Sequence, residues 1–450
     1  MKRSAISKLR ILYRRFQRSN SPQFNLVWGF FLYTIAGFVL LALPFFHKTD
    51  VSFIDSLFIS TSAVSTTGLV TIGVESSFNL GGQLVILLLF QVGGIGYMTL
   101  TTYYLLFTTN RISSWHQRLI GTEFTMPETI QIKDFIRSVI LYTIVMEVLG
   151  TIAFYVAFSD TGMDGGQAFW YAVFHSVSAF CTAGFALFGD SFESFTDAPG
   201  VNAIIAVLAI AGSLGFIVAT DIWYRISGRS SRLSFTTKIV VWGSFLLLLM
   251  GTLLFYFSDP DGGDGMDTLL SAFFQSMTAM TTVGFNTVPI GDLALPTLLF
   301  MTFLMYVGAS PSGTAGGLKI TTLTAMVAVL KSRLFGQKRV SFFNHLIPFE
   351  RLYVATSTFM LYTSLIFLFT FLMSYSEPFR FEQILFEVAS ALGTVGLSTG
   401  ITGDLSTTGK WLIIVIMFVG RVGVLTFGFA LLARAKKDDE VLSEEGDLAV

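Results

Sequence analysis

Long apolar stretches separated by short polar ones run along the whole chain of 450 residues. A helix needs about 20 predominantly apolar residues to cross the hydrocarbon core of a bilayer. Eight stretches are long enough and predict membrane-crossing helices, at residues 26–46, 83–107, 137–158, 201–220, 238–257, 296–330, 352–373 and 411–433. The pattern therefore predicts an all-α, polytopic membrane protein.

Four further apolar segments are shorter, and each ends in a sequence rich in Thr and Gly, at residues 55–69, 169–185, 269–285 and 383–397. Apolar segments that are too short to span a membrane often re-enter it instead. The order of crossing, short segment and crossing occurs four times along the chain. We therefore predict four units, each with a re-entrant pore helix between two crossings.

The short segments align without gaps on one motif, F-x3-S/T-A-x2-T-x-G-L/F. The motif glycines are Gly68, Gly184, Gly284 and Gly396, and a second glycine follows each of them after 24 to 28 residues, at Gly93, Gly212, Gly308 and Gly420. Small residues are common in membrane helices because they allow close packing, which would explain an isolated match. Six aligned positions in four places instead favour an internal repeat of about 110 residues.

The composition agrees with a membrane protein and excludes several other classes. Hydrophobic residues make up 53% of the chain and charged residues 13%, whereas soluble proteins average about 25% charged residues. One cysteine cannot form an intramolecular disulfide, and four scattered histidines offer no zinc-ligand spacing. The predicted crossings also lack a constellation of His, Asp, Glu and Ser typical of an intramembrane enzyme.

The basic residues fall on one side of the predicted membrane. Of 28 Lys and Arg residues, 23 lie in the N-terminal lead, three alternate loops and the C-terminal tail. The opposite loops contain only Lys48, Arg380 and Lys410. Because cytosolic loops carry the excess of Lys and Arg, we expect both termini to be cytosolic and the short segments to enter from outside. The pattern gives no indication of nucleic-acid binding.

The repeats predict a central pore. Each unit contains two crossings, so all units have the same orientation and are related by an axis along the membrane normal, which favours a central passage. A helix from residue 58 to 65 would be roughly 12 Å long and would end inside the membrane. Non-helical backbone at that depth must be buried in protein or line a watery cavity. Four such loops could surround a cation with carbonyl oxygens, a coordination that suits potassium.

These features resemble the Trk/Ktr/HKT superfamily of potassium transporters over residues 25–435. The chain is most similar to the bacterial Ktr membrane subunit (KtrB and KtrD type), judged from its length, the break at residues 308–317 and Arg421. The resemblance implies potassium uptake through a selectivity filter whose four motif glycines coordinate K⁺. It places the filter at Ser65, Thr66, Thr67, Gly68, Cys181, Thr182, Ala183, Gly184, Thr281, Thr282, Val283, Gly284, Gly393, Thr394, Val395 and Gly396. In related plant proteins a Ser at the first of these glycines goes with sodium permeation, so four glycines imply a preference for potassium.

The third unit's second crossing is interrupted by a run of small residues. The run consists of Gly308, Ala309, Ser310, Pro311, Ser312, Gly313, Thr314, Ala315, Gly316 and Gly317. The resemblance implies an intramembrane gate that obstructs the pore, and the alternative is a proline kink repaired by neighbouring helices.

Two further intramembrane positions carry charge or a thiol. Arg421 lies within an apolar crossing, where a charge costs about 2.5 to 3.5 kcal/mol on insertion scales. The resemblance makes it an obstacle to cations, and the alternative is a buried pair with Glu147. Lys319 and Asp221 are expected to be ordinary anchors near the cytosolic ends of crossings. Cys181 is expected to act as a small apolar filler.

The resemblance also implies partners. It predicts a homodimer in the bacterial plasma membrane, on which a cytosolic ring of RCK-type subunits similar to KtrA or KtrC docks. ATP or ADP would bind only to that ring, because this chain has no nucleotide-binding motif in a soluble context. The basic loops could meet the ring or anionic lipid. No covalent cofactor is expected; K⁺ is the transported ion, with possible activation by Na⁺. The alternative mechanism is a secondary symporter that couples K⁺ to Na⁺ or H⁺.

The repeats divide the chain into six predicted regions. The four pore units occupy residues 26–110, 111–224, 225–335 and 336–435. A basic cytosolic segment, residues 1–25, precedes them, and an acidic cytosolic tail, residues 436–450, follows.

Overall fold

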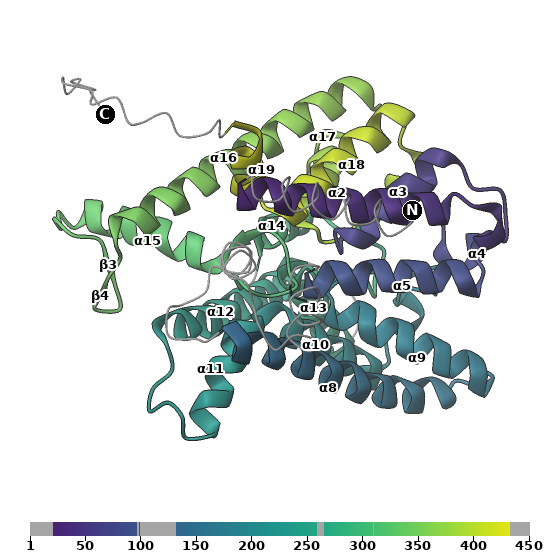
Figure 1. The fold of residues 1–450 in the computed structure, drawn as a ribbon, viewed down its shortest axis with the longest axis horizontal. Coiled ribbons are helices and arrows are strands. Elements are labelled where there is room, and N and C mark those ends of the chain that lie inside the picture. Colours follow the sequence, from purple (N-terminus) through teal and green to yellow (C-terminus); the bar gives the residue numbers. More distant parts are fainter. Residues whose placement is uncertain (1–20, 97–98, 100–131, 259–264, 309, 433–450) are drawn as a thin grey trace, which may run out of the picture.

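The computed structural model describes residues 21–96, 99, 132–258, 265–308 and 310–432. Most of the predicted basic N-terminal segment, the end of the crossing predicted at 83–107, Ala309 of the predicted gate and the acidic tail lie outside these ranges. The described part of the chain is almost entirely helical (Figure 1).

Four long helices, one per repeat, lie on the outside of the molecule: α2 (Pro22–Leu41), α8 (Ile132–Ser159), α12 (Phe235–Ser258) and α16 (Phe349–Ser376). They contain 20, 28, 24 and 28 residues. Within the most apolar part of each of these helices, only 22–33% of the residues are buried. Helices that expose apolar side chains over most of their surface suit a lipid environment, so these helices have the length and surface of membrane spans.

Each long helix is followed by a short one: α3 (Phe53–Val64), α9 (Gly165–Phe180), α13 (Gly265–Thr281) and α17 (Phe381–Gly393). Side chains cap the start of two of them, since Ser52 accepts from the Asp55 N–H and Asp164 from the Gly166 N–H. The motif phenylalanines Phe58, Phe174, Phe274 and Phe386 are all fully buried. The C-terminal halves of the short helices therefore lie inside the protein, whereas α3, α9 and α17 each begin with an exposed residue.

The second crossings are α5 (Leu80–Ile95), α10 (Pro199–Leu214), α14 (Leu295–Tyr306) and α18 (Thr407–Val422), continued by α11 (Phe216–Ile226), α15 (Ile320–Leu334) and α19 (Val424–Leu432). The sequence predicts a break in the third of them, and the structure contains breaks in the second and fourth as well. The α10–α11 and α18–α19 pairs bend by 92° and 99°. Gly215 and Gly423 have positive φ, which ends an α-helix.

Of the described helices, four could cross a membrane by length and composition, or six if each bent pair counts as one span. The helices α5 and α14 are shorter, with 16 and 12 residues. The remaining elements are short: η1 (Pro44–Phe46), α4 (Val74–Ser77), η2 (Glu193–Phe195), η3 (Ile290–Asp292), η4 (Thr402–Asp404), the parallel pair β1 (Val307–Gly308) and β2 (Leu318–Lys319), and the hairpin of β3 (Ser341–Phe342) and β4 (His345–Leu346).

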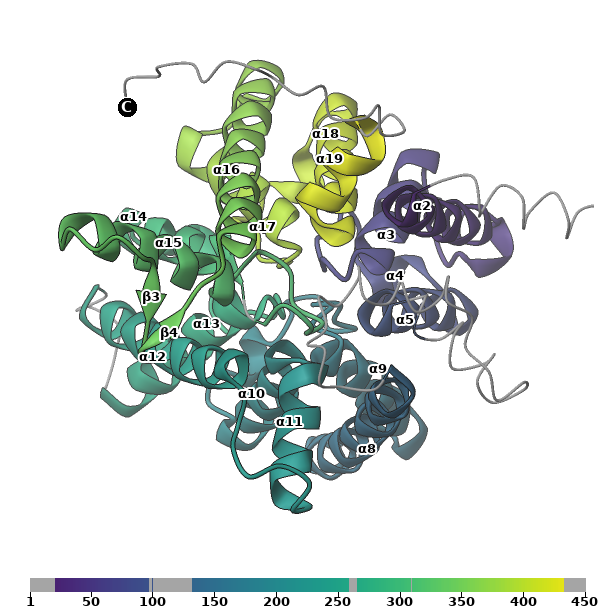
Figure 2. The ribbon, with the colours of Figure 1, turned by 60° about the vertical axis from the view of Figure 1, so that its left-hand side comes forward.

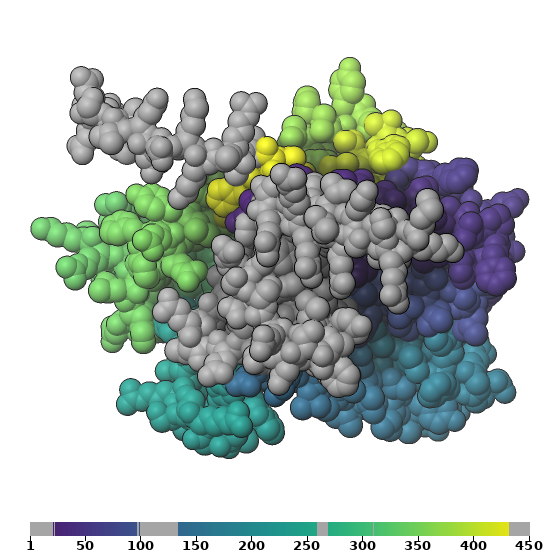
Figure 3. All heavy atoms as spheres, in the orientation of Figure 1, coloured from purple at the N-terminus to yellow at the C-terminus, as the bar shows by residue number. Residues whose placement is uncertain are grey.

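Figure 2 shows the helices of the four repeats following one another around the centre, from α2 through α9 and α13 to α18. The last repeat packs against the first, with α18 on α3 and α19 on α2. In the space-filling view the two ends of the described chain, purple and yellow, meet on one face (Figure 3). The chain therefore returns to its starting point in space.

Candidate functional site

The four motif segments share one backbone conformation. In each segment the Thr and the Gly two residues later have positive φ, at Thr66 and Gly68, Thr182 and Gly184, Thr282 and Gly284, and Thr394 and Gly396. The Thr φ angles are 53°, 49°, 56° and 49°. A β-branched residue avoids this left-handed region, and such strain usually costs about 1–3 kcal/mol and persists where surrounding contacts impose it.

Hydrogen bonds to the motif Ser/Thr supply those contacts. The N–H before each motif glycine donates to the carbonyl oxygen five residues earlier, at 2.8 Å for Thr67 to Ser62, 2.8 Å for Ala183 to Ser178, 3.2 Å for Val283 to Thr278 and 2.8 Å for Val395 to Ser390. The hydroxyls of Ser62 and Ser390 also accept from the N–H of Gly68 and Gly396, each at 3.1 Å. Sequence analysis did not assign these Ser/Thr residues to the site, although the motif contains them.

The four glycines lie in one closed ring. A Cβ added to Gly68 would come within 2.6 Å of the Ala183 carbonyl oxygen, and one added to Gly184 within 2.7 Å of that of Val283. A Cβ on Gly284 would overlap the Val395 carbonyl, and one on Gly396 would overlap that of Thr67. Each glycine thus faces the carbonyl that precedes the next glycine, and the fourth faces the first repeat. No side chain larger than hydrogen fits at these positions.

A cavity of about 510 Å³ opens on one side of this ring and is lined by all four glycines. Glu75, Asp190, Glu193 and Asp292 also line it, and the described lining residues include no Lys or Arg. Partial burial raises the pKa of Glu193, against the opposing effect of a 2.7 Å hydrogen bond from Asn286 Nδ2, and nearby Asp190 and Asp292 raise it further. We call this space the outer cavity; its charge attracts cations.

The predicted gate lies on the other side of the filter segments. All of its residues except Ala309 are described, and residues 310–314 pack on the break between α10 and α11. The Ser310 and Thr314 N–H groups donate to the carbonyl oxygens of Ser213 and Gly212, and the Phe216 N–H donates to that of Ser312. The bend at Gly215 therefore exposes the backbone groups to which this loop binds. The sequence did not predict this role for Gly215.

The same loop forms hydrogen bonds with two of the four threonines of the predicted filter. Thr182 Oγ1 donates to Thr314 Oγ1 at 3.1 Å, and Thr282 Oγ1 accepts from the Gly316 N–H at 3.0 Å. A third, Thr66 Oγ1, accepts from Arg421 Nη1 at 3.1 Å. The hydroxyl of Thr394 is buried without a hydrogen-bond partner among the described residues. The loop and Arg421 together thus cover the filter on the side away from the outer cavity.

Arg421 joins three repeats at this point. Besides Thr66, its guanidinium donates to the carbonyl oxygen of Thr314 at 2.8 Å and to those of Gly93 and Gly94 in α5. The alternative of a direct pair with Glu147 is wrong, because the ion pairs within the described chain are Lys48–Glu75 and Lys410–Asp55.

Glu147 instead lies near the thiol of the second filter segment. Cys181 Sγ donates to Gln91 Oε1 at 3.4 Å and lies 3.9 Å from Glu147 Oε1. Cys181 is fully buried within the hydrophobic core, as a small apolar filler should be, and its thiol in addition faces these two polar side chains.

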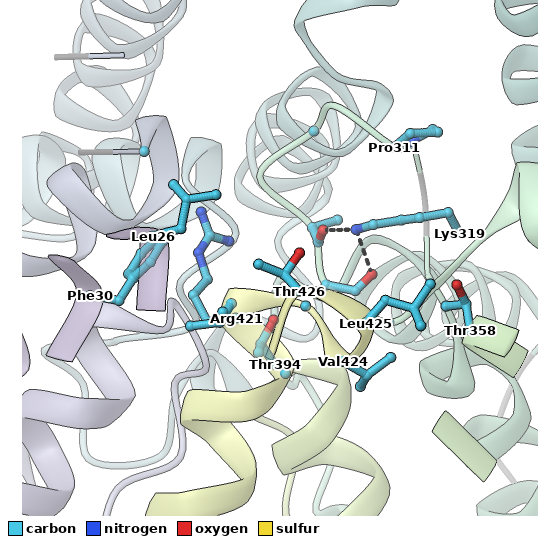
Figure 4. Close-up of a pocket in the computed structure, with 18 of the residues that line it drawn as sticks. Leu26, Phe30, Pro311, Lys319, Thr358, Thr394, Arg421, Val424, Leu425 and Thr426 are labelled. Atoms are coloured by element: carbon cyan, nitrogen blue, oxygen red, sulfur yellow. Dashed lines mark hydrogen bonds between the residues drawn. The ribbon is translucent and has the colours of Figure 1, made fainter. Parts of the chain in front are cut away.

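Lys319 is also placed differently from the expectation of an interface anchor. Its ammonium turns toward the gate and donates to the carbonyl oxygens of Ala315 and Gly316, at 2.6 and 3.3 Å (Figure 4). The loop has carbonyls that no helix satisfies, and the lysine two residues beyond Gly317 supplies donors for them. The position of Lys319 directly after the break was the sequence feature that could have predicted this contact.

Lys319, Arg421 and Thr394 line a second cavity of about 250 Å³, the inner cavity, together with α2 side chains such as Phe30 (Figure 4). The ring of glycines and the gate loop thus lie between an outer cavity lined by carboxylates and an inner cavity lined by two cationic side chains. Within the described residues, no group of three or more His, Cys, Asp or Glu could hold a metal ion.

Comparison with known proteins identifies the family. A family model for TrkH, described as a cation transport protein, matches residues 30–259 and 264–443. The Ktr system potassium uptake protein B of Vibrio alginolyticus is 35% identical over 400 residues, which cover 87% of each chain. The potassium/sodium uptake protein NtpJ of Enterococcus hirae is 32% identical over 440 residues, covering 95% of this chain and 96% of that protein.

A solved structure has the same fold. The potassium transporter TrkH from Vibrio parahaemolyticus matches with a TM-score of 0.71 at 20% identity, over 90% of this chain and 83% of that one. The chain therefore belongs to the TrkH family of cation transport proteins, and it is a multi-pass membrane transporter rather than an enzyme.

Proposed function

We propose that this chain takes up potassium through the ring of the four T-x-G segments, as the membrane subunit of a Ktr-type complex. The observation that carries the proposal is the identical strained backbone of the four segments and their closure into one ring. Two relatives named for potassium uptake support the choice of ion.

In this proposal the filter replaces the water shell of K⁺ with backbone carbonyl oxygens. Left-handed Thr and Gly residues turn successive carbonyls in different directions, as a coordinating ring requires. The four glycines hold the ion at the narrowest level, because only they leave room next to the neighbouring carbonyls. The motif Ser/Thr residues keep the strained backbone in place.

The gate consists of residues 308–317 with Arg421. In the closed state the loop bonds to the filter threonines and to the α10–α11 bend, while Arg421 places a positive charge in the path of the ion. A cation that leaves the filter must displace this loop. Opening therefore requires that these hydrogen bonds break together.

We further propose eight crossings, two in each of the four pore units predicted from the sequence, with both termini in the bacterial cytosol. The exposed apolar surface of the long helices and the basic loops support this arrangement. We also propose a homodimer that binds an RCK-type ring, with ATP or ADP bound on that ring and with Na⁺ as a possible activator. Support comes from the Ktr system to which the Vibrio relative belongs.

Uptake of K⁺ or Rb⁺ into a potassium-starved bacterium that lacks its own uptake systems tests the proposal. Cells that express this chain should take up the ion, and a co-expressed Ktr-type cytosolic subunit should increase the rate. Gly396→Ser should abolish uptake, because the added side chain overlaps the Thr67 carbonyl and φ is +96°. Gly200→Ser is the matched control, since nothing lies within 4 Å of its added carbon. Absent uptake in every condition contradicts the proposal.

A symporter that couples K⁺ to Na⁺ is the second candidate, favoured by the relative named for both ions. It predicts that steady K⁺ uptake requires Na⁺ in a fixed ratio. A channel-like pore predicts uptake that follows the membrane potential alone, which contributes about 2.3 kcal/mol per charge per 100 mV.

A further inference from the structure

The four repeats meet at four junctions, and one junction differs from the others. The chain itself connects the first repeat to the second, the second to the third and the third to the fourth. The fourth repeat meets the first without a peptide connection, through α18 on α3 and α19 on α2. Non-covalent contacts alone must close the ring at this point.

A repeated sequence position supplies contacts between neighbouring repeats. The residue ten positions before each second glycine is Gln83, Asn202, Leu298 or Lys410. Gln83 Oε1 accepts from Trp170 Nε1 at 2.7 Å, on the short helix α9 of the next repeat. Lys410 Nζ donates to Asp55 Oδ1 at 2.8 Å, on the short helix α3 of the first repeat. The same position thus holds the next pore helix at two junctions.

The contact is a salt bridge only at the junction without a peptide connection. At the second junction Asn202 bonds to carbonyls of its own repeat, and at the third junction Leu298 is apolar. The side chains of Lys410 and Asp55 are 14% and 13% exposed, against 40% and 47% for the other described ion pair, Lys48–Glu75. Burial reduces screening by salt, so the Lys410–Asp55 pair is held more firmly than the Lys48–Glu75 pair.

The Lys410–Asp55 pair is also connected to the filter by a single short helix, α3. Asp55 lies in the first turn of α3 and is fixed by a 2.6 Å hydrogen bond from Ser52 Oγ. That helix leads directly to Thr66 and Gly68, and Gly68 contacts Gly396 across the same junction. Displacement of α3 relative to α18 would therefore change the spacing of the carbonyls in one quarter of the ring.

We propose that Asp55 and Lys410 are positioning residues that close the four-repeat ring and thereby set ion selectivity. The inference rests on the proposed function of the ring as a potassium filter. It predicts that loss of the pair widens the junction between Gly396 and Gly68 and admits Na⁺. The ability to transport cations is retained.

Charge reversal and its compensation test the proposal. Asp55→Lys and Lys410→Asp should each lower the ratio of Rb⁺ to Na⁺ uptake about tenfold, which corresponds to about 1.4 kcal/mol of discrimination. The double exchange should restore most of the ratio. Lys48→Met removes another outer lysine and should leave the ratio unchanged. Reduced selectivity in the single variants without recovery in the double variant would overturn the proposal.

A covalent replacement keeps the test decisive if charge reversal prevents folding. In the Asp55→Cys and Lys410→Cys double variant, a short thiol-specific cross-linker should join the two positions, as mass spectrometry after proteolysis can detect. Selectivity should be low before cross-linking and should recover after it. A cross-linked ring with unchanged selectivity refutes the positioning role while the wild type still takes up Rb⁺. If the wild type transports neither ion, it is the proposed function that fails.

Discussion

The outer and inner cavities differ in the sign of their charged side chains and in the origin of their walls. Four carboxylate side chains line the outer cavity, whereas Lys319 and Arg421 line the inner one. The segments that follow the short helices, including α4, η2 and η3, line the outer cavity, whereas the breaks in the second crossings and side chains of α2 and α16 line the inner one. In the proposed uptake, a cation is thus attracted toward the ring from the outer cavity and repelled where it enters the inner cavity.

In the proposed pore, this difference gives a direction to an arrangement of four similar repeats. The filter segments are nearly equivalent in all four repeats, but the gate loop comes from the third repeat and Arg421 from the fourth. The difference between the two sides of the ring therefore comes from residues that the other repeats do not share. Variants of these residues should change the two cavities separately.

Deletion of residues 310–315 should give the largest effect on the inner side. The deletion removes the bonds to Thr182 and to the α10–α11 bend, and we expect Rb⁺ uptake to rise about tenfold or more, the change that a barrier lower by about 1.4 kcal/mol produces. Unchanged uptake by a folded deletion variant would contradict the gating role.

Arg421→Gln should have the next largest effect. It removes the charge while an amide can still donate a hydrogen bond, and we expect uptake to rise severalfold, up to about tenfold. Arg421→Lys keeps the charge and should stay close to the wild type, which separates electrostatic from structural effects. Arg380→Gln, at an exposed outer position, is the control. Equal uptake by the Gln and Lys variants would argue against an electrostatic barrier.

Lys319→Met should act in the same direction but less strongly. The substitution leaves the Ala315 and Gly316 carbonyls without their ammonium donor, and we expect uptake to rise about two- to threefold, equivalent to roughly 0.5 kcal/mol. Rb⁺ uptake and the open probability in patch recordings provide the readout. A fall in uptake would mean that the lysine supports the open rather than the closed loop.

The outer side should respond to ionic strength. Asp190→Asn with Asp292→Asn should raise the half-saturating Rb⁺ concentration about two- to threefold at low salt, because fewer charges attract the ion. The effect should vanish at high salt, where the Debye length falls to about 3 Å. An effect that persists at high salt would point to direct coordination instead.

The smallest effect should be a pH dependence from Glu193. Its pKa lies above the usual 4.5, so as the pH falls it becomes neutral earlier than an ordinary glutamate. The half-saturating Rb⁺ concentration should therefore rise modestly as the pH falls from neutral to acidic values. The Glu193→Gln variant should show a flatter pH profile, and an identical profile would exclude this residue as the cause.

Much of the fold could be predicted from the sequence because its signals are local or repeated. The long apolar stretches correspond to α2, α8, α12 and α16 within a few residues. The motif predicted four short helices, and each of them ends one or two residues before the motif Thr. The bends at Gly215 and Gly423 could not be predicted from hydropathy, since the residues on both sides of each bend are apolar.

The sequence by itself determined the repeat, the apolar segments and the positions of the motif glycines, because these depend on local requirements of the backbone that hydropathy and small-residue patterns reveal. The tertiary structure alone decided which groups meet: Arg421 with three other segments, Lys319 with the gate carbonyls, and Lys410 with Asp55. These partners lie as far as 355 residues apart. Their choice depends on how the helices pack, a property that no local pattern contains.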